Sequence, residues 1–271
     1  MTEILTAVIP VVIIGIICAA VLVVASKIMA VKEDERFPAV RECLPGANCG
    51  ACGYAGCDGY AKALVEDEST PTNLCTPGGA TVAKQLSEAL GVEFTEVARQ
   101  VAVIHCYGDC EHTKDQVDYR GMESCSAANL LFGGKGECIY GCLGMGDCRK
   151  VCPQDAICIE NGIAHIRQSL CIGCGLCAKT CPNGLISMMT DKVQAVVSCS
   201  NIDKGALTRK VCSNGCIGCR KCVKVCPGGA IDVVNNVAVI DGDKCTGCGE
   251  CAANCTTNCI MMYDENGLHR V

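Results

Sequence analysis

Residues 171–182 read CIGCGLCAKTCP, a run in which four cysteines follow the spacing C-x2-C-x2-C-x3-C and a proline comes next. The same spacing returns at residues 216–226 and 245–255, and an imperfect version spans residues 142–152. In bacterial proteins this run holds [4Fe–4S] clusters, and its fourth cysteine ligates the neighbouring cluster. The sequence therefore predicts iron–sulfur clusters, whose chemistry is electron transfer.

The composition favours iron–sulfur over the two other uses of dense cysteine. The chain has 29 cysteines in 271 residues, an odd number, and tightly spaced triplets lack partners at the Cα separation that a disulfide needs. Zinc sites usually pair two C-x2-C knuckles or add histidine, and none of the four histidines lies in a knuckle. A net charge of −6 argues against nucleic acid as a partner.

The amino-terminal segment from Ile4 to Ser26 carries no charged side chain. About 20 apolar residues in a helix span the hydrocarbon core of a membrane, so we expect residues 1–27 to form a single transmembrane anchor helix. A cleaved signal peptide is the rival interpretation, but residues 1–3 lack its basic character. Basic residues follow the helix, and the positive-inside rule then predicts a single-pass protein of the cell (inner) membrane with cytoplasmic soluble domains.

Residues 28–80 form a second predicted unit with its own cluster. Three cysteines lie in the glycine-rich loop from Leu44 to Cys57, a helix is expected over Asp58 to Glu66, and a fourth cysteine follows. A zinc site is the alternative, because a tetrahedral set of four thiolates also suits zinc. Cys43 is a competing local donor. The predicted ligands are Cys49, Cys52, Cys57 and Cys75.

The carboxy-terminal half repeats internally. Two short apolar runs flank Asn161-Gly162, and two more flank Asn235-Asn236; Asn-Gly is the strongest short signal for a β-hairpin. Loop, helix, hairpin and loop are the plan of a bacterial ferredoxin with two clusters. We therefore expect an α+β protein whose two tandem ferredoxin-like domains, each for two [4Fe–4S] clusters, occupy residues 136–190 and 191–271.

The crossover of the fourth cysteine assigns three ligand sets in these two domains. One cluster of the first domain takes Cys171, Cys174, Cys177 and Cys152. One cluster of the second domain takes Cys216, Cys219, Cys222 and Cys255. Its partner takes Cys245, Cys248, Cys251 and Cys226.

The remaining cluster of the first domain lacks a thiolate. The imperfect run at residues 142–152 has Met145 where the second cysteine belongs, and we expect Cys138 to replace it. A three-iron cluster is the alternative. Cys212 lies at the equivalent offset before Cys216, where no ligand is lacking, and this weakens the argument for Cys138. The expected set is Cys138, Cys142, Cys148 and Cys181.

The connecting segment, residues 81–135, contains an expected helix over Ala80 to Leu90, a strand over Val101 to Ile104 and a sparse group of cysteines. Two interpretations stay open for this group: ordinary buried thiols, or an additional cluster completed by Cys138, Cys199 or Cys212. The sequence thus predicts five clusters and leaves a sixth open. The sparse group is Cys106, Cys110 and Cys125, whereas buried thiols are the default for Cys18, Cys43, Cys158 and Cys259.

The order of modules resembles the B subunit of Rnf-type ion-translocating ferredoxin–NAD oxidoreductase complexes. The resemblance rests on the apolar helix, the Leu-Pro-Gly…Cys-Gly-x-Cys-Gly-x-x-Gly-Cys loop at residues 44–57, the Cys-x-Pro-Gly-Gly ending at residues 75–79 and the trailing ferredoxin motifs. It implies a subunit that accepts electrons from reduced ferredoxin, beside membrane and NAD-binding subunits that reduce NAD and move sodium ions or protons.

The chain itself lacks the G-x-G-x-x-G fingerprint of a dinucleotide site after a strand, so we expect electron relay without substrate chemistry of its own. A basic group near the third run suggests docking of an acidic ferredoxin, with a merely solvated face as the alternative. Two other functions stay open: an iron–sulfur subunit of a different membrane oxidoreductase, and a non-redox metal scaffold. The basic group is Lys204, Arg209, Lys210, Arg220, Lys221 and Lys224.

Overall fold

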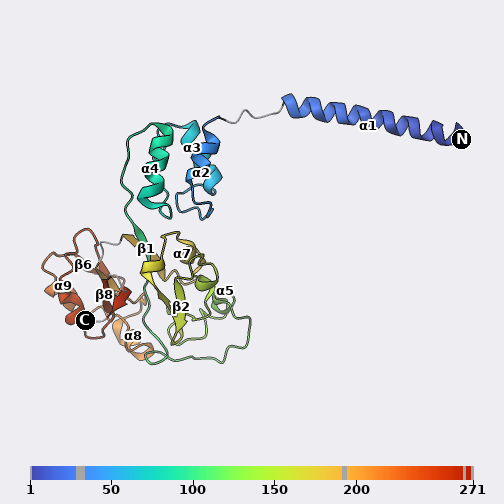
Figure 1. Cartoon of the computed structure of the whole chain (residues 1–271). Coiled ribbons are helices and arrows are strands. Elements are labelled where there is room, and N and C mark those ends of the chain that lie inside the picture. The colour runs from blue at the N-terminus through green and yellow to red at the C-terminus, as the bar shows by residue number, and fades with distance from the viewer. Residues whose placement is uncertain (1, 29–33, 191–193, 265–266, 270–271) are drawn as a thin grey trace.

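The computed structural model describes residues 2–28, 34–190, 194–264 and 267–269. Figure 1 shows helices in the amino-terminal part of the chain and short strands with short helices in the remainder. The expected α+β class is confirmed by this mixture of helices and strands.

The chain begins with helix α1 (Thr2–Ile28), so the expected helix at the amino terminus is present. Its side chains are described only from Val12 to Ser26, and residues 4–11 of the predicted anchor lie outside that range. Over the residues that the structure describes, none of the helices combines the length and the hydropathy that a membrane-spanning segment needs. The membrane-spanning role of this helix stays a prediction.

Three helices build the amino-terminal four-cysteine unit, residues 34–91. They are α2 (Phe37–Cys43), α3 (Cys57–Glu66) and α4 (Gly79–Leu90), and the predictions over residues 58–66 and 80–90 are confirmed. The fully buried Tyr60 joins α3 to the next loop: its hydroxyl donates to the carbonyl of Pro71 at 2.6 Å and accepts from the amide of Leu74 at 3.3 Å. This pair of bonds holds the loop that carries Cys75 against the helical core.

Each half of the carboxy-terminal part contains a β-hairpin. Strand β2 (Ile157–Glu160) pairs with β3 (Ile163–Ile166), and β6 (Ile231–Val234) pairs with β7 (Val237–Ile240). Both turns use two residues with positive φ, between 48° and 80°, as the tight hairpin turns of this kind require. The two predicted hairpins are confirmed.

Outer strands complete each half. Strand β1 (Gln100–Ile104) pairs antiparallel with β4 (Ile186–Thr190), and β5 (Ala195–Val197) pairs with β8 (Ile260–Asp264), which also pairs with β9 (Gly267–His269). We call residues 100–190 the first unit and residues 195–264 the second unit. The predicted strand over residues 101–104 is confirmed, but it belongs to the first unit rather than to a mere connection.

Strand β1 is buried on both faces and joins the two units. Ala102 and Ile104 lie in the core of the first unit, whereas Val101 and Val103 pack against Val196 of the second unit. Side chains alternate between the faces of a strand, so one strand can serve two cores. The two units therefore share this strand.

Short helices follow the cysteine loops of both units. In the first unit these are α6 (Asp147–Lys150) and α7 (Leu176–Thr180); in the second they are α9 (Lys221–Val225) and α10 (Glu250–Ala253). Three further elements belong to the two units: α5 (Cys125–Asn129), a 3₁₀ turn (Gln168–Leu170) and α8 (Gly205–Val211).

Two equivalent glycines place the cysteine loops against the hairpin turns. Gly144 has φ +68°, and a Cβ added there would lie 2.3 Å from the carbonyl oxygen of Gly162. Gly218 has φ +63°, and its added Cβ would lie 3.0 Å from the carbonyl oxygen of Asn236. Both the conformation and the close approach require glycine.

We predict that Gly144→Ala lowers the unfolding free energy by about 1–3 kcal/mol, because it forces an alanine into positive φ and against backbone. The measurement is anaerobic denaturant unfolding followed by circular dichroism. Gly59→Ala is the control, since its Cβ would meet neighbours at an ordinary 3.8 Å inside helix α3. Equal destabilisation of both variants would contradict this prediction.

Candidate cluster-binding sites

The first unit brings together one complete set of predicted ligands. A cavity beside β1 is lined by Cys152, Cys171, Cys174 and Cys177, the set expected from the crossover of the fourth cysteine. The amide of Ala102 on β1 donates to the sulfur of Cys171 at 3.4 Å. The outer strand thus helps to position a predicted ligand.

The second unit repeats this arrangement. One cavity is lined by Cys216, Cys219, Cys222 and Cys255, and the amide of Ala238 on β7 donates to the sulfur of Cys216 at 3.4 Å. The crossover expected for Cys255 is therefore seen in the geometry.

The second predicted set of this unit contributes to the same core. Cys226, Cys245 and the buried Cys251 contact the core of the unit, and Cys248 interacts electrostatically with Cys251. The amide of Ala230 donates to the sulfur of Cys226 at 3.3 Å.

The amino-terminal unit gathers its four predicted ligands around Cys75. The thiols of Cys57, Cys49 and Cys52 all interact electrostatically with it. Cys43, the competing donor, points its thiol to the carbonyl of Ala39 at 3.2 Å, as an ordinary helix thiol does. The geometry therefore favours Cys75 as the fourth member of this set.

The cavity of the incomplete run contains a different fourth cysteine from the expected one. It is lined by Cys142, Cys148 and Cys181, and Cys125 completes the four. The structure does not bring Cys138 to this cavity. Met145, which occupies the position of the missing thiolate, packs against the small core formed by Cys125, Ala128 and Leu143.

Hydrogen bonds hold helix α5, and with it Cys125, over the incomplete run. The Asp147 carboxylate accepts from the hydroxyl of Ser124 at 2.7 Å and from the amide of Ser126 at 3.1 Å. Lys150 donates to the carbonyl of Glu123 at 2.8 Å. No spacing rule in the sequence signals this contact, because Cys125 begins a short helix outside the repeat.

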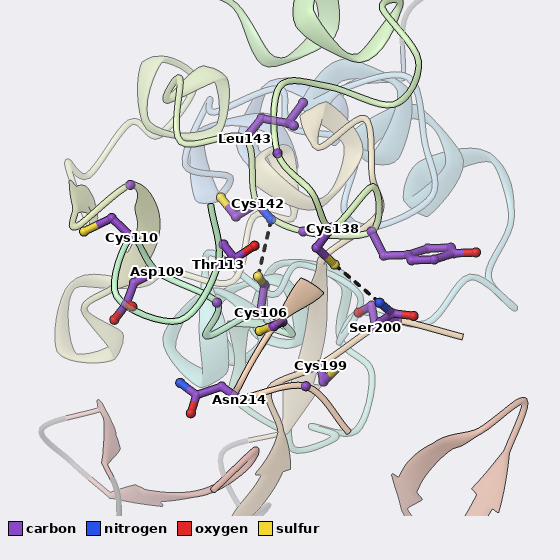
Figure 2. Close-up of a pocket in the computed structure, with 18 of the residues that line it drawn as sticks. Cys106, Asp109, Cys110, Thr113, Cys138, Cys142, Leu143, Cys199, Ser200 and Asn214 are labelled. Carbon is purple, nitrogen blue, oxygen red and sulfur yellow. Dashed lines mark hydrogen bonds between the residues drawn. The ribbon is translucent and has the colours of Figure 1, made fainter. Parts of the chain in front are cut away.

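A larger cavity of about 340 Å³ lies between the two units (Figure 2). It collects Cys106, Cys110, Cys138, Cys199 and Cys212, all of which are candidates for an additional site on sequence grounds. Cys142 also reaches its wall. Cys125, another of those candidates, lies instead in the cavity of the incomplete run.

The donor chemistry of these sites fits thiolate-held clusters. Backbone amides donate to predicted ligand sulfurs at Cys171, Cys181, Cys216 and Cys226, and such bonds are a recognised feature of cluster sites. Burial raises the pKa of Cys148 and Cys177 to about 12, so binding of a metal cluster there must release protons.

In the part of the chain that the structure describes, no group of three or more His, Cys, Asp and Glu side chains could hold one metal ion. A [4Fe–4S] cluster takes one thiolate on each of its irons, so its four sulfurs need not converge on a single ion.

Cys259 is a functional candidate that the sequence did not signal. It is only 2% exposed and lines the same cavity as Cys216 and Cys255. Its sulfur lies 3.6 Å from that of Cys255. As a hydrogen-bond donor to one or the other, the Cys259 thiol lowers the pKa of Cys216 and of Cys255. Cys259 is therefore placed to donate to a predicted ligand sulfur.

We predict that Cys259→Ala lowers the midpoint potential of the second-unit cluster expected at Cys216, Cys219, Cys222 and Cys255. The expected change is on the order of 40 mV, the equivalent of one hydrogen bond of about 1 kcal/mol. A donor to the sulfurs stabilises the more negative, reduced cluster, so its removal favours the oxidised form. The measurement is a redox titration followed by electron paramagnetic resonance. Cys158→Ala is the control, because that thiol lies on β2 and faces the carbonyl of His165. Loss of about four irons from Cys259→Ala would instead make it a ligand.

The sequence matches two iron–sulfur families. Residues 44–77 match the family described as "Putative Fe-S cluster". Residues 170–230 and 215–259 match the family described as "4Fe-4S dicluster domain". These matches show that the chain contains iron–sulfur and [4Fe–4S] dicluster domains.

Several relatives align with nearly the whole chain. The B subunit of the Na(+)-translocating ferredoxin:NAD(+) oxidoreductase complex of Acetobacterium woodii is 41% identical over 93% of this chain and 76% of its own length. The B subunit of the proton-translocating ferredoxin:NAD(+) oxidoreductase complex of Clostridium ljungdahlii is 45% identical over 92% and 88%. The B subunit of the ion-translocating oxidoreductase complex of Methanosarcina acetivorans is 40% identical over 92% and 94%.

Proposed function

Because the chain belongs to the B-subunit family of ion-translocating oxidoreductase complexes, we propose that it is the iron–sulfur subunit that relays electrons inside a ferredoxin:NAD(+) oxidoreductase complex. One observation carries this function: each of the three units, from the amino-terminal unit to the second unit, brings a predicted set of four cysteines together. When bound, the clusters supply one-electron chemistry, and the protein holds them at fixed positions. Membership of this family favours the role over another membrane oxidoreductase or a metal scaffold.

We assign five [4Fe–4S] sites to the cysteine runs. Four of them use the ligands predicted from spacing, and the fifth is the cavity that Cys142 shares with Cys148, Cys181 and Cys125. Nicotinamide chemistry then belongs to partner subunits, because no dinucleotide fingerprint occurs in this sequence.

Contacts between units support a continuous route. Lys179 of α7 donates to the carbonyls of Cys49 and Gly50 at 3.2 and 3.4 Å. The hydroxyl of Thr76 donates to the carbonyl of Gly173 at 3.0 Å. These bonds seat the loop of the amino-terminal set against the loop of the Cys171 set.

The electron donor is proposed to be reduced ferredoxin, docking on the second unit. Cys219 is an exposed predicted ligand, and the exposed cations Lys221 and Lys224 follow it on helix α9. An acidic carrier would be steered to this surface and would reach a ligand that lies at the surface itself.

The charge reversal Lys221→Glu/Lys224→Glu should slow ferredoxin-dependent NAD reduction by the whole complex on the order of tenfold at low salt, and less as salt screens the field. Steady-state rates across an ionic-strength series measure this effect. Lys84→Glu on helix α4 is the matched control in a different unit. Rates equal to those of the control at every ionic strength would contradict the proposal that ferredoxin docks on this surface. A native complex that fails to reduce NAD with reduced ferredoxin would contradict the proposed relay function.

We also propose that the segment Ile4 to Ser26 anchors the chain in the membrane. Support comes from the absence of charged side chains along it, its place in helix α1 and the basic residues Lys27, Lys32 and Arg36 that follow it. The soluble units would then lie on the cytoplasmic side.

The full chain should stay with the membrane fraction after alkaline carbonate extraction, whereas a variant lacking residues 1–27 should be released, because carbonate removes peripheral proteins only. Immunoblots of pellet and supernatant measure the partition, with both chains expressed without partner subunits. Retention of the shortened chain would contradict the anchor.

A further inference from the structure

Four cysteines from four separate segments line the cavity between the two units, and three of them (Cys106, Cys138 and Cys199) are labelled in Figure 2. Cys106 follows strand β1, Cys138 precedes the incomplete run, Cys199 follows strand β5, and Cys212 follows helix α8. Cys106 and Cys212 are buried, and the other two are half-buried. Both ferredoxin-like units therefore contribute sulfur to one space.

The backbone around these four sulfurs resembles that around the predicted ligands. The amide two residues further along the chain interacts with each sulfur, at Gly108, Tyr140, Asn201 and Asn214. The same relation holds for predicted ligands, since Gly144 interacts with Cys142 and Gly218 interacts with Cys216.

Hydrogen bonds distinguish these sulfurs from ordinary buried thiols. Cys106 accepts from the amide of Cys142 at 3.3 Å, and Cys138 accepts from the side-chain amide of Asn201 at 3.5 Å. By contrast, the thiols of Cys43 and Cys158 donate to carbonyls at 3.2 and 3.8 Å. Hydrogen bonds from N–H groups to ligand sulfurs are a recognised feature of cluster sites.

Close packing also argues against unliganded thiols here. A free buried cysteine acts as a small hydrophobic side chain that fills core space. These four cysteines instead line a cavity of about 340 Å³. Cys110 is not part of the set, because it is exposed and lies to one side in Figure 2.

We infer that Cys106, Cys138, Cys199 and Cys212 hold a sixth [4Fe–4S] cluster between the two ferredoxin-like units, and that Cys125 therefore replaces Cys138 in the set of the incomplete run. This inference rests on the proposed relay function.

The sixth site links neighbouring sets on both sides. The amide of Cys142, a predicted ligand of the first unit, donates to the sulfur of Cys106. The amide of Cys216, a predicted ligand of the second unit, interacts with the sulfur of Cys199. The site thus fills the step between the two units in the proposed electron route.

The iron and sulfide content of the anaerobically purified full chain tests the count directly. Six clusters require about 24 irons per chain and five require about 20, at four irons for each cluster. Cys106→Ala and Cys212→Ala should each lower the iron content by about four, while Cys110→Ala, from the same cavity wall, should leave it unchanged.

Pairs of substitutions then test which cysteines share a cluster. Cys106→Ala/Cys138→Ala should lose about four irons, as one shared site predicts, whereas Cys106→Ala/Cys125→Ala should lose about eight. Electron paramagnetic resonance of the reduced samples shows whether the other clusters persist.

A native chain with about 20 irons, or with one zinc in this cavity, would overturn the sixth site and leave the relay function standing. A loss of about eight irons in Cys106→Ala/Cys138→Ala would overturn the assignment of Cys138. A chain with almost no iron would remove both the site and the proposed function. The native count decides the question even where a variant does not fold.

Discussion

Sulfur atoms held by backbone amides are the constraint on which this structure depends. With 3% aromatic residues and no Trp, the units have little apolar material for a large core. Cysteines such as Cys57, Cys148 and Cys222 instead lie within the cores themselves. Metal binding is coupled to folding at sites of this kind. Local turns, glycines and outer strands consequently position the cysteine sulfurs as well as burying apolar surface.

Local spacing made much of the architecture predictable from sequence. The runs at residues 171–181, 216–226 and 245–255 each form a short loop. The spacing of the cysteines along each run therefore predicts which of them lie close together. The hairpins at Asn161-Gly162 and Asn235-Asn236 were equally predictable from the sequence, because their turns need residues that tolerate positive φ.

The contributions from distant segments could not be predicted in the same way. Cys125 is held at the incomplete run by the bonds of Asp147 to Ser124 and Ser126, a contact between two helices that are separate in the sequence. The repeat pattern instead favoured Cys138, which lies nearer in sequence but faces the cavity between the units. The expected start of the first ferredoxin-like domain at residue 136 left out strand β1 for a similar reason. Its partner β4 comes more than eighty residues later, at Ile186–Thr190.

Sharing strand β1 has an evolutionary consequence. A ferredoxin module that arises by gene duplication can ordinarily be appended, lost or exchanged as a self-contained cassette. Here the alternating side chains of one strand complete the interiors of both copies, through Ala102 on one face and Val103 on the other. Recombination that removed either copy would expose an apolar surface on the survivor, so gain or loss of a single copy carries a folding cost.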